Sequence, residues 1–104
     1  MARKAFKMFL NKGAEAEYKK RHEETWPEIK NLLKDAGFSN YSIFLDEETN
    51  VLFGVLNYDD EIRYQNISLQ PIMQKWWDYM KDLMETNKDN SPQSADLTEV
   101  FYLK

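Results

Sequence analysis

The residues best suited to chemistry lie in the segment EYKKRHEETWPEIK, residues 17–30, which holds the only histidine of the sequence. Tyr18 lies four positions before His22 and Trp26 four positions after it, so helical spacing places the three side chains on one face. An imidazole has an unperturbed pKa of about 6.5, so it can both give and take a proton near neutral pH. Acid–base catalysis by His22 is therefore one interpretation. A half-buried histidine that bonds a backbone carbonyl is the other.

A second candidate is the tandem tryptophan in KWWDYM. Adjacent helical residues project about 100° apart, so Trp76 and Trp77 cannot face the same way. One interpretation places one indole in the core with Met73 and Met80 and the other at the surface or a subunit contact. The other places one or both on the wall of a sugar site, where an aromatic face packs against the C–H face of a pyranose. Tyr41 could add a phenol to such a site, or pack between sheet and helix.

These residues must be positioned by alternating strands and helices. Residues 4–10 alternate as a strand does, and residues 14–36 follow helical spacing up to a terminating glycine at position 37. Two strand-like runs around a polar turn predict an antiparallel hairpin, and a long helical pattern with an interruption at Pro71 follows. The remaining ranges that we predict are strands at 38–46, 51–59 and 97–103, the helical pattern at 59–85, and a loop between it and the last strand.

Pro27 lies inside the first helical pattern, where a proline removes a backbone hydrogen bond and crowds the preceding turn. Thr25 is a suitable cap for a new helix, with Trp26 and Pro27 in the first turn and Glu28 reaching back as a capping box. We therefore expect a break or sharp kink just after His22. Such a break would leave groups near His22 free to face a cavity.

The element order β-α-β-β-α-β predicts an α+β fold of the ferredoxin-like plan, with one antiparallel sheet and both helices on one face. The whole chain, residues 1–104, is long enough for one domain and has no room for a second. The uncovered sheet face would still be rich in apolar side chains, which argues against its being wet. We therefore expect a homodimer, through facing sheets or swapped edge strands. The apolar side chains concerned are Phe9, Phe44, Phe53, Val100 and Tyr102.

The composition of the chain limits the kinds of partner that it can bind. The formal net charge is -4, with Lys and Arg interspersed among Asp and Glu, so no basic stripe suits nucleic acid. The start of the chain never reaches an apolar run of signal-peptide length, and nothing approaches a membrane span. Cysteine is absent, which excludes disulfides and cysteine-based metal sites and is consistent with a reducing compartment. A cytoplasmic protein without nucleic-acid or membrane partners is the expectation.

Most cofactor chemistry lacks its usual signature in this sequence. A lone histidine without cysteine makes a zinc site improbable, and the acidic runs lack the spacing of a calcium loop. The sequence contains no dinucleotide fingerprint, no phosphate-binding loop and no serine nucleophile elbow. Cofactor-free and metal-free proton transfer is the chemistry that remains.

Four motifs together resemble the L-rhamnose mutarotase family over essentially the whole chain: RHEETWPE (21–28), KWWDYM (75–80), DNSP (89–92) and EVFYL (99–103). The resemblance implies a dimeric α+β barrel of ferredoxin-like subunits that is cytoplasmic and interconverts the α and β anomers of L-rhamnose. It also implies a role for each site residue. The family's proton donor falls on His22, and its sugar contacts fall on Tyr18, Tyr41, Trp76 and Trp77.

Such a reaction opens the hemiacetal ring and recloses it on the other face of the carbonyl, which takes an acid and a base but no metal. His22 could protonate the ring oxygen. The base stays open among a carboxylate, a second role for His22, and water. Two other functions also stay open on the same scaffold: a non-catalytic binding module in which His22 is a hydrogen-bond donor or haem ligand, and a cofactor-free monooxygenase.

Overall fold

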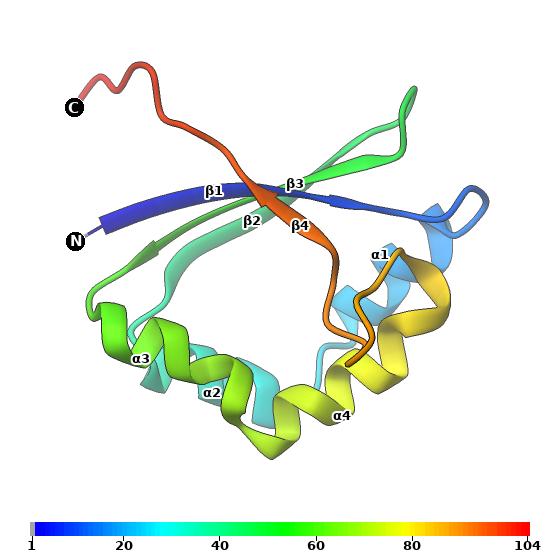
Figure 1. Cartoon of the computed structure of the whole chain (residues 1–104), viewed down its shortest axis with the longest axis horizontal. Coiled ribbons are helices and arrows are strands. Elements are labelled where there is room, and N and C mark those ends of the chain that lie inside the picture. Colours follow the sequence, from blue (N-terminus) through cyan, green and yellow to red (C-terminus); the bar gives the residue numbers. More distant parts are fainter. Residues whose placement is uncertain (1) are drawn as a thin grey trace.

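A computed structural model describes residues 2–104. Its four strands form one antiparallel sheet in the spatial order β2-β3-β1-β4, and the helices lie against one face of it (Figure 1). The order βαββαβ and the ferredoxin-like α+β fold are thereby confirmed. The elements are β1 (Ala2–Phe9), α1 (Glu15–Glu23), α2 (Pro27–Asp35), β2 (Ser39–Asp46), β3 (Val51–Tyr58), α3 (Glu61–Asn66), α4 (Pro71–Met80) and β4 (Ser94–Asp96), with 3₁₀ turns at Ile67–Leu69 and Lys81–Leu83.

Alternation along the strands gives the sheet one buried face. Met8 of β1 and Leu52 and Leu56 of β3 are almost fully buried, and they pack towards the helices. Buried helical residues such as Ile29 and Met80 complete this core. The other face carries Phe44, which is 60% exposed, so apolar surface remains uncovered there.

The predicted break in the first helical pattern is confirmed. α1 ends at Glu23 and α2 begins at Pro27, which takes the first helical position, where its missing N–H costs nothing. The capping prediction was wrong, however. Trp26 is the N-cap of α2 and makes no side-chain cap bond, whereas the Thr25 hydroxyl donates to the His22 carbonyl (2.6 Å) at the end of α1.

Gly37 ends α2 as predicted. Its φ of +85° is left-handed, and the amides of Gly37 and Phe38 donate to the carbonyls of Lys34 and Leu33, which is a Schellman motif. The second helical pattern is also interrupted where predicted. Gln70 is extended, and Pro71 begins α4.

The last strand is not where the alternation placed it. Residues 97–103 have no strand structure, and β4 lies at Ser94–Asp96, inside the range predicted as a loop. β4 occupies the edge beside β1, and beyond the bond from the Leu97 amide to the Ala5 carbonyl the chain leaves the sheet. Side chains hold the segment that follows, because the Arg3 guanidinium lies 3.6 Å from the centroid of the Tyr102 ring and bonds Glu99 (3.1 Å).

None of the helices between residues 2 and 104 combines the length and the apolar character needed to cross a bilayer.

The pair Phe6–Gly54 gives a direct test of the core. The two residues are opposite in the β1–β3 register, and a Cβ added at Gly54 would lie 2.5 Å from the end of the Phe6 ring. We expect Gly54→Ala to lower the free energy of unfolding by about 1–3 kcal/mol through overpacking. Combining it with Phe6→Leu should recover part of that loss, since the smaller side chain makes room. Urea unfolding of both single variants and the double variant measures the coupling, and strictly additive losses would contradict a contact between the two positions.

Candidate active site

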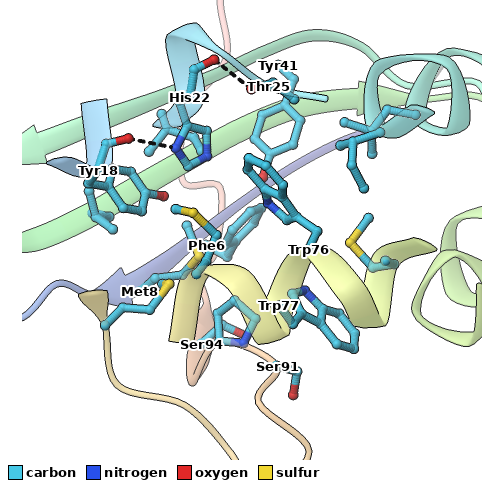
Figure 2. Close-up of a pocket in the computed structure, with 18 of the residues that line it drawn as sticks. Phe6, Met8, Tyr18, His22, Thr25, Tyr41, Trp76, Trp77, Ser91 and Ser94 are labelled. Atoms are coloured by element: carbon cyan, nitrogen blue, oxygen red, sulfur yellow. Dashed lines mark hydrogen bonds between the residues drawn. The ribbon is translucent and has the colours of Figure 1, made fainter. Parts of the chain in front are cut away.

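A cavity of about 1160 Å³ lies between the helix-covered face of the sheet and the helices. All five residues singled out from the sequence line it, from three different elements: Tyr18 and His22 from α1, Tyr41 from β2, and Trp76 and Trp77 from α4. Figure 2 shows their side chains around a common space. The lining is mainly apolar with a few polar groups, which is typical of small-molecule sites.

His22 is held by its own helix. Its Nδ1 lies 3.1 Å from the carbonyl oxygen of Tyr18, one turn earlier in α1. A carbonyl oxygen can only accept, so Nδ1 is the nitrogen that carries the proton. The opposite nitrogen, Nε2, points into the cavity (Figure 2). In the neutral ring Nε2 therefore presents a lone pair to anything bound there.

Burial lowers the pKa of His22 below its ordinary 6.5, and the bond with the Tyr18 carbonyl opposes that effect only in part. Desolvation disfavours the charged form of an imidazole. At neutral pH the ring is therefore mostly neutral, and its resting form is a base. Once protonated, the same ring is a stronger acid than an exposed histidine.

Two phenols accompany the imidazole. The Tyr18 ring lies 4.3 Å from the His22 ring between centroids. Burial raises the pKa of the Tyr18 phenol and of the Tyr41 phenol, with a smaller contribution in each case from a neighbouring tyrosine. Both phenols therefore keep their protons well above neutral pH and can donate hydrogen bonds inside the cavity.

Tyr41 lies in β2 beside an irregularity of the strand. Ser39 pairs with Asn57 and Ser42 with Val55, so β2 has one residue more than β3 between these pairs. The extra residue makes a β-bulge, with Asn40 at a left-handed φ of +51°. Tyr41 lines the cavity with Ile43 and Leu45, which is the ordinary alternation of a strand.

The tandem tryptophans divide their roles, and both line the cavity. Trp76 is buried in the core cluster, and Trp77 is half-buried beside it. The Trp76 ring lies edge-on to His22, 5.8 Å between centroids. Trp26 does not line the cavity but packs edge-on against Trp76 at 5.0 Å, so it supports the wall from behind.

Arg21, next to His22, ties α1 to the end of α4. Its guanidinium donates to both carboxylate oxygens of Asp82 (2.9 and 3.2 Å) and to the Tyr79 carbonyl, and it lies 4.5 Å from the centroid of the Tyr79 ring. Glu17 adds an intrahelical pair at 2.9 Å. This set of contacts fixes the helix that carries His22 against the helix that carries the tryptophans.

Sequence reasoning missed two parts of the cavity wall. Phe6 lines the cavity, and its ring centroid lies 6.3 Å from that of Tyr41. The alternation of its strand predicts only a core residue at this position. The loop after α4 contributes Asn87, Asp89 and Ser91, which composition assigned to an ordinary surface loop. Nothing in the local pattern of these polar residues indicates that they turn towards a cavity.

Within residues 2–104, no three histidine or acidic side chains gather closely enough to hold a metal ion. The groups that line the cavity include one imidazole, two phenols and two indoles, together with carboxylates such as Glu15, Glu47 and Asp89. This arrangement can move a proton on a small, partly apolar polyol.

Comparison with known proteins agrees with this chemistry. The sequence model of a family described as L-rhamnose mutarotase matches residues 3–103. An L-rhamnose mutarotase of Lachnoclostridium phytofermentans is 53% identical over 103 residues, which is 99% of each chain. One of Enterococcus faecalis is 52% identical over 99% of this chain and 100% of its own.

Solved structures give the same result. The crystal structure of an L-rhamnose mutarotase from Formosa agariphila superimposes with a TM-score of 0.93 at 51% identity and covers all of both chains. A protein from an uncultured marine organism, described as dimeric and ferredoxin-like, superimposes with a TM-score of 0.61 at 18% identity and shares the fold. It covers 98% of this chain and 96% of its own. The chain therefore belongs to the L-rhamnose mutarotase family.

Proposed function

We propose that the protein interconverts the α and β anomers of L-rhamnose by opening and reclosing the sugar ring. The observation that carries this proposal is His22, whose Nδ1 proton is committed to the Tyr18 carbonyl while Nε2 points into an indole-walled cavity. The identity of the substrate comes from relatives in the family, which are named L-rhamnose mutarotase and share about half of their residues with this chain over its full length.

One imidazole can serve both oxygen atoms of the reaction, because the anomeric hydroxyl and the ring oxygen are bonded to the same carbon. Neutral Nε2 takes the proton of the anomeric hydroxyl, the bond between C1 and the ring oxygen breaks, and the new imidazolium gives that proton to the departing ring oxygen. The open aldehyde rotates about C1–C2, and the reverse sequence closes the ring on the other face. His22 ends as it began, so it is both base and proton donor.

The remaining groups bind and orient. The Tyr18 and Tyr41 phenols keep their protons and can donate to sugar oxygens, including an oxygen that becomes negative as the ring opens. Trp76 and Trp77 offer apolar faces for the C–H side of the sugar and for the C6 methyl group. One methyl group discriminates by only about 1–3 kcal/mol, so a sugar that differs from L-rhamnose only in lacking this methyl group should still react, though more slowly.

We also propose that the chain is a single domain over residues 1–104, acts in the cytoplasm and works as a homodimer. The segment after β4 supports the dimer, since it alternates like a strand but pairs with none among the described residues. Three of its apolar side chains are 78–92% exposed: Val100, Phe101 and Leu103. A second copy would give this segment a sheet edge and cover the apolar outer face. The distant relative of the same fold is described as dimeric.

Removal of the imidazole should abolish most of the catalysis. We expect His22→Gln to lower kcat by about 10²–10⁴-fold, the usual contribution of general acid–base catalysis, while the fold is kept. Exchange between the two anomeric proton signals of L-rhamnose in NMR measures the rate. Glu24→Gln, an exposed change two residues away, is the matched control and should match wild type. If the wild-type protein leaves the exchange at the buffer rate, the proposed function is wrong.

The pH profile tests which form of His22 reacts. Because burial lowers its pKa, kcat/KM should be constant at and above neutral pH and fall in acid with a midpoint below pH 6.5, as the resting ring becomes protonated. The buffer-catalysed rate must be subtracted at each pH. A rate that falls steadily between pH 6.5 and 8 would mean that imidazolium is the resting reactive form and that neutral Nε2 does not take the first proton.

The dimer is tested by light scattering on a sizing column. We expect wild type to have the mass of two chains and Phe101→Asp to shift towards one, because a carboxylate would have to be buried between subunits. Leu69→Asp adds the same charge at a residue that is 76% exposed outside the C-terminal segment, and it should leave the mass unchanged. A monomeric wild-type protein at micromolar concentration would count against the dimer.

A further inference from the structure

The loop between α4 and β4 is strongly bonded to itself. The Asn87 amide donates to the Ser91 carbonyl (2.8 Å), and Thr86 and Pro92 form an isolated antiparallel bridge. Oδ1 of Asp89 accepts from both the amide (3.0 Å) and the hydroxyl (2.5 Å) of Ser91. Residues 86–92 therefore have a defined shape, although several of their side chains are exposed.

Two side chains of α4 fasten this loop to the helix. Nε2 of Gln74 donates to the Asp89 carbonyl (2.7 Å) and to Oδ1 of Asp78 (3.0 Å). The same Asp78 oxygen accepts from Nδ2 of Asn90 (2.9 Å). We call these four residues the loop clasp. Its amide donors lower the pKa of Asp78, so the acceptor stays ionised at neutral pH.

The clasp lies beside the cavity but is not part of the proton-transfer machinery. Trp77 is three residues after Gln74, so the two side chains are neighbours on the surface of α4. The clasped loop lines the cavity next to it through Asn87, Asp89 and Ser91. Figure 2 shows Trp77 and Ser91 on the side of the cavity opposite His22.

We propose that Gln74 and Asp78 are positioning residues. They hold loop 86–92 in place beside Trp77 before the sugar binds, so that the loop contacts the sugar on the side of the cavity opposite His22. The inference rests on the proposed function and adds a structural basis for substrate affinity. A loop that is already in place needs no ordering when the sugar binds, so losing the clasp should weaken binding. The chemical step depends on α1, on the other side of the cavity, and should continue once the sugar is bound.

The main test is Gln74→Glu, which keeps the side-chain shape. It removes both donated bonds and sets a carboxylate against the Asp89 carbonyl and the Asp78 carboxylate. We expect KM for L-rhamnose to rise about tenfold, which corresponds to the loss of a hydrogen bond or two, while kcat stays within about twofold of wild type. Titration of tryptophan fluorescence with L-rhamnose measures the weaker binding independently of turnover.

Asp78 offers a conservative rescue. Asp78→Ala removes the acceptor and should raise KM like Gln74→Glu, whereas Asp78→Asn keeps an Oδ1 acceptor for Gln74 and Asn90 and should stay within about threefold of wild type. Lys75→Gln is the control. It makes the same change of one charge unit as Gln74→Glu, at an exposed neighbouring position on α4, and should leave KM unchanged.

The experiment distinguishes a failure of the clasp proposal from a failure of the proposed function. If wild type accelerates anomer exchange but KM is unchanged in both Gln74→Glu and Asp78→Ala, the clasp has no positioning role. The same conclusion follows if kcat falls as far as KM rises, or if Asp78→Asn is as impaired as Asp78→Ala. If Gln74→Glu does not fold, Asp78→Ala and Asp78→Asn decide the matter alone. If wild type itself is inactive on L-rhamnose, the proposed function fails instead.

Discussion

The site depends on a single hydrogen bond, from Nδ1 of His22 to the carbonyl of Tyr18. Both partners lie in α1, so the bond needs no partner from elsewhere in the fold. It fixes the ring's orientation and its tautomer, and it leaves Nε2 for the cavity. Because burial also lowers the pKa of the ring, the imidazole is kept mostly neutral at neutral pH and can act as a base in the cavity.

The rest of the fold fixes where that ring lies. The break between α1 and α2 ends the helix one residue after His22, and Arg21 ties α1 to α4 through Asp82 and Tyr79. α4 thereby brings Trp76 edge-on to the imidazole. On the opposite side of the cavity, the loop clasp fixes a wall that the reaction itself does not use. Proton transfer is thus assigned to α1, and the clasped wall to α4 and its loop, which is why variants of the loop clasp should change KM and leave kcat.

Much of this could be predicted from the sequence, and the exceptions share a cause. Helical spacing around His22, the proline at position 27 and Gly37 are local signals, and each led to the right element boundary within a few residues. The final strand was misplaced because alternation in residues 97–103 shows only that the segment suits a sheet, not whose edge it joins. Tyr41 was expected in the site from the family resemblance, and the alternation of β2 places it there with Ile43 and Leu45. The bulge at Asn40 has no local signal, because it depends on pairing with β3. The wall formed by loop 86–92 depends on contacts with α4 that are distant in sequence.

The mechanism requires His22 to rest as a neutral imidazole with its proton on Nδ1, and ¹⁵N NMR of the side chain can observe that state directly. The chain has one histidine, so its two ring-nitrogen signals need no further assignment to a residue. At pH 7 we expect a protonated Nδ1 and an unprotonated Nε2 whose signal shifts when L-rhamnose is added. A proton on Nε2, an imidazolium at that pH, or signals indifferent to the sugar would rule the mechanism out.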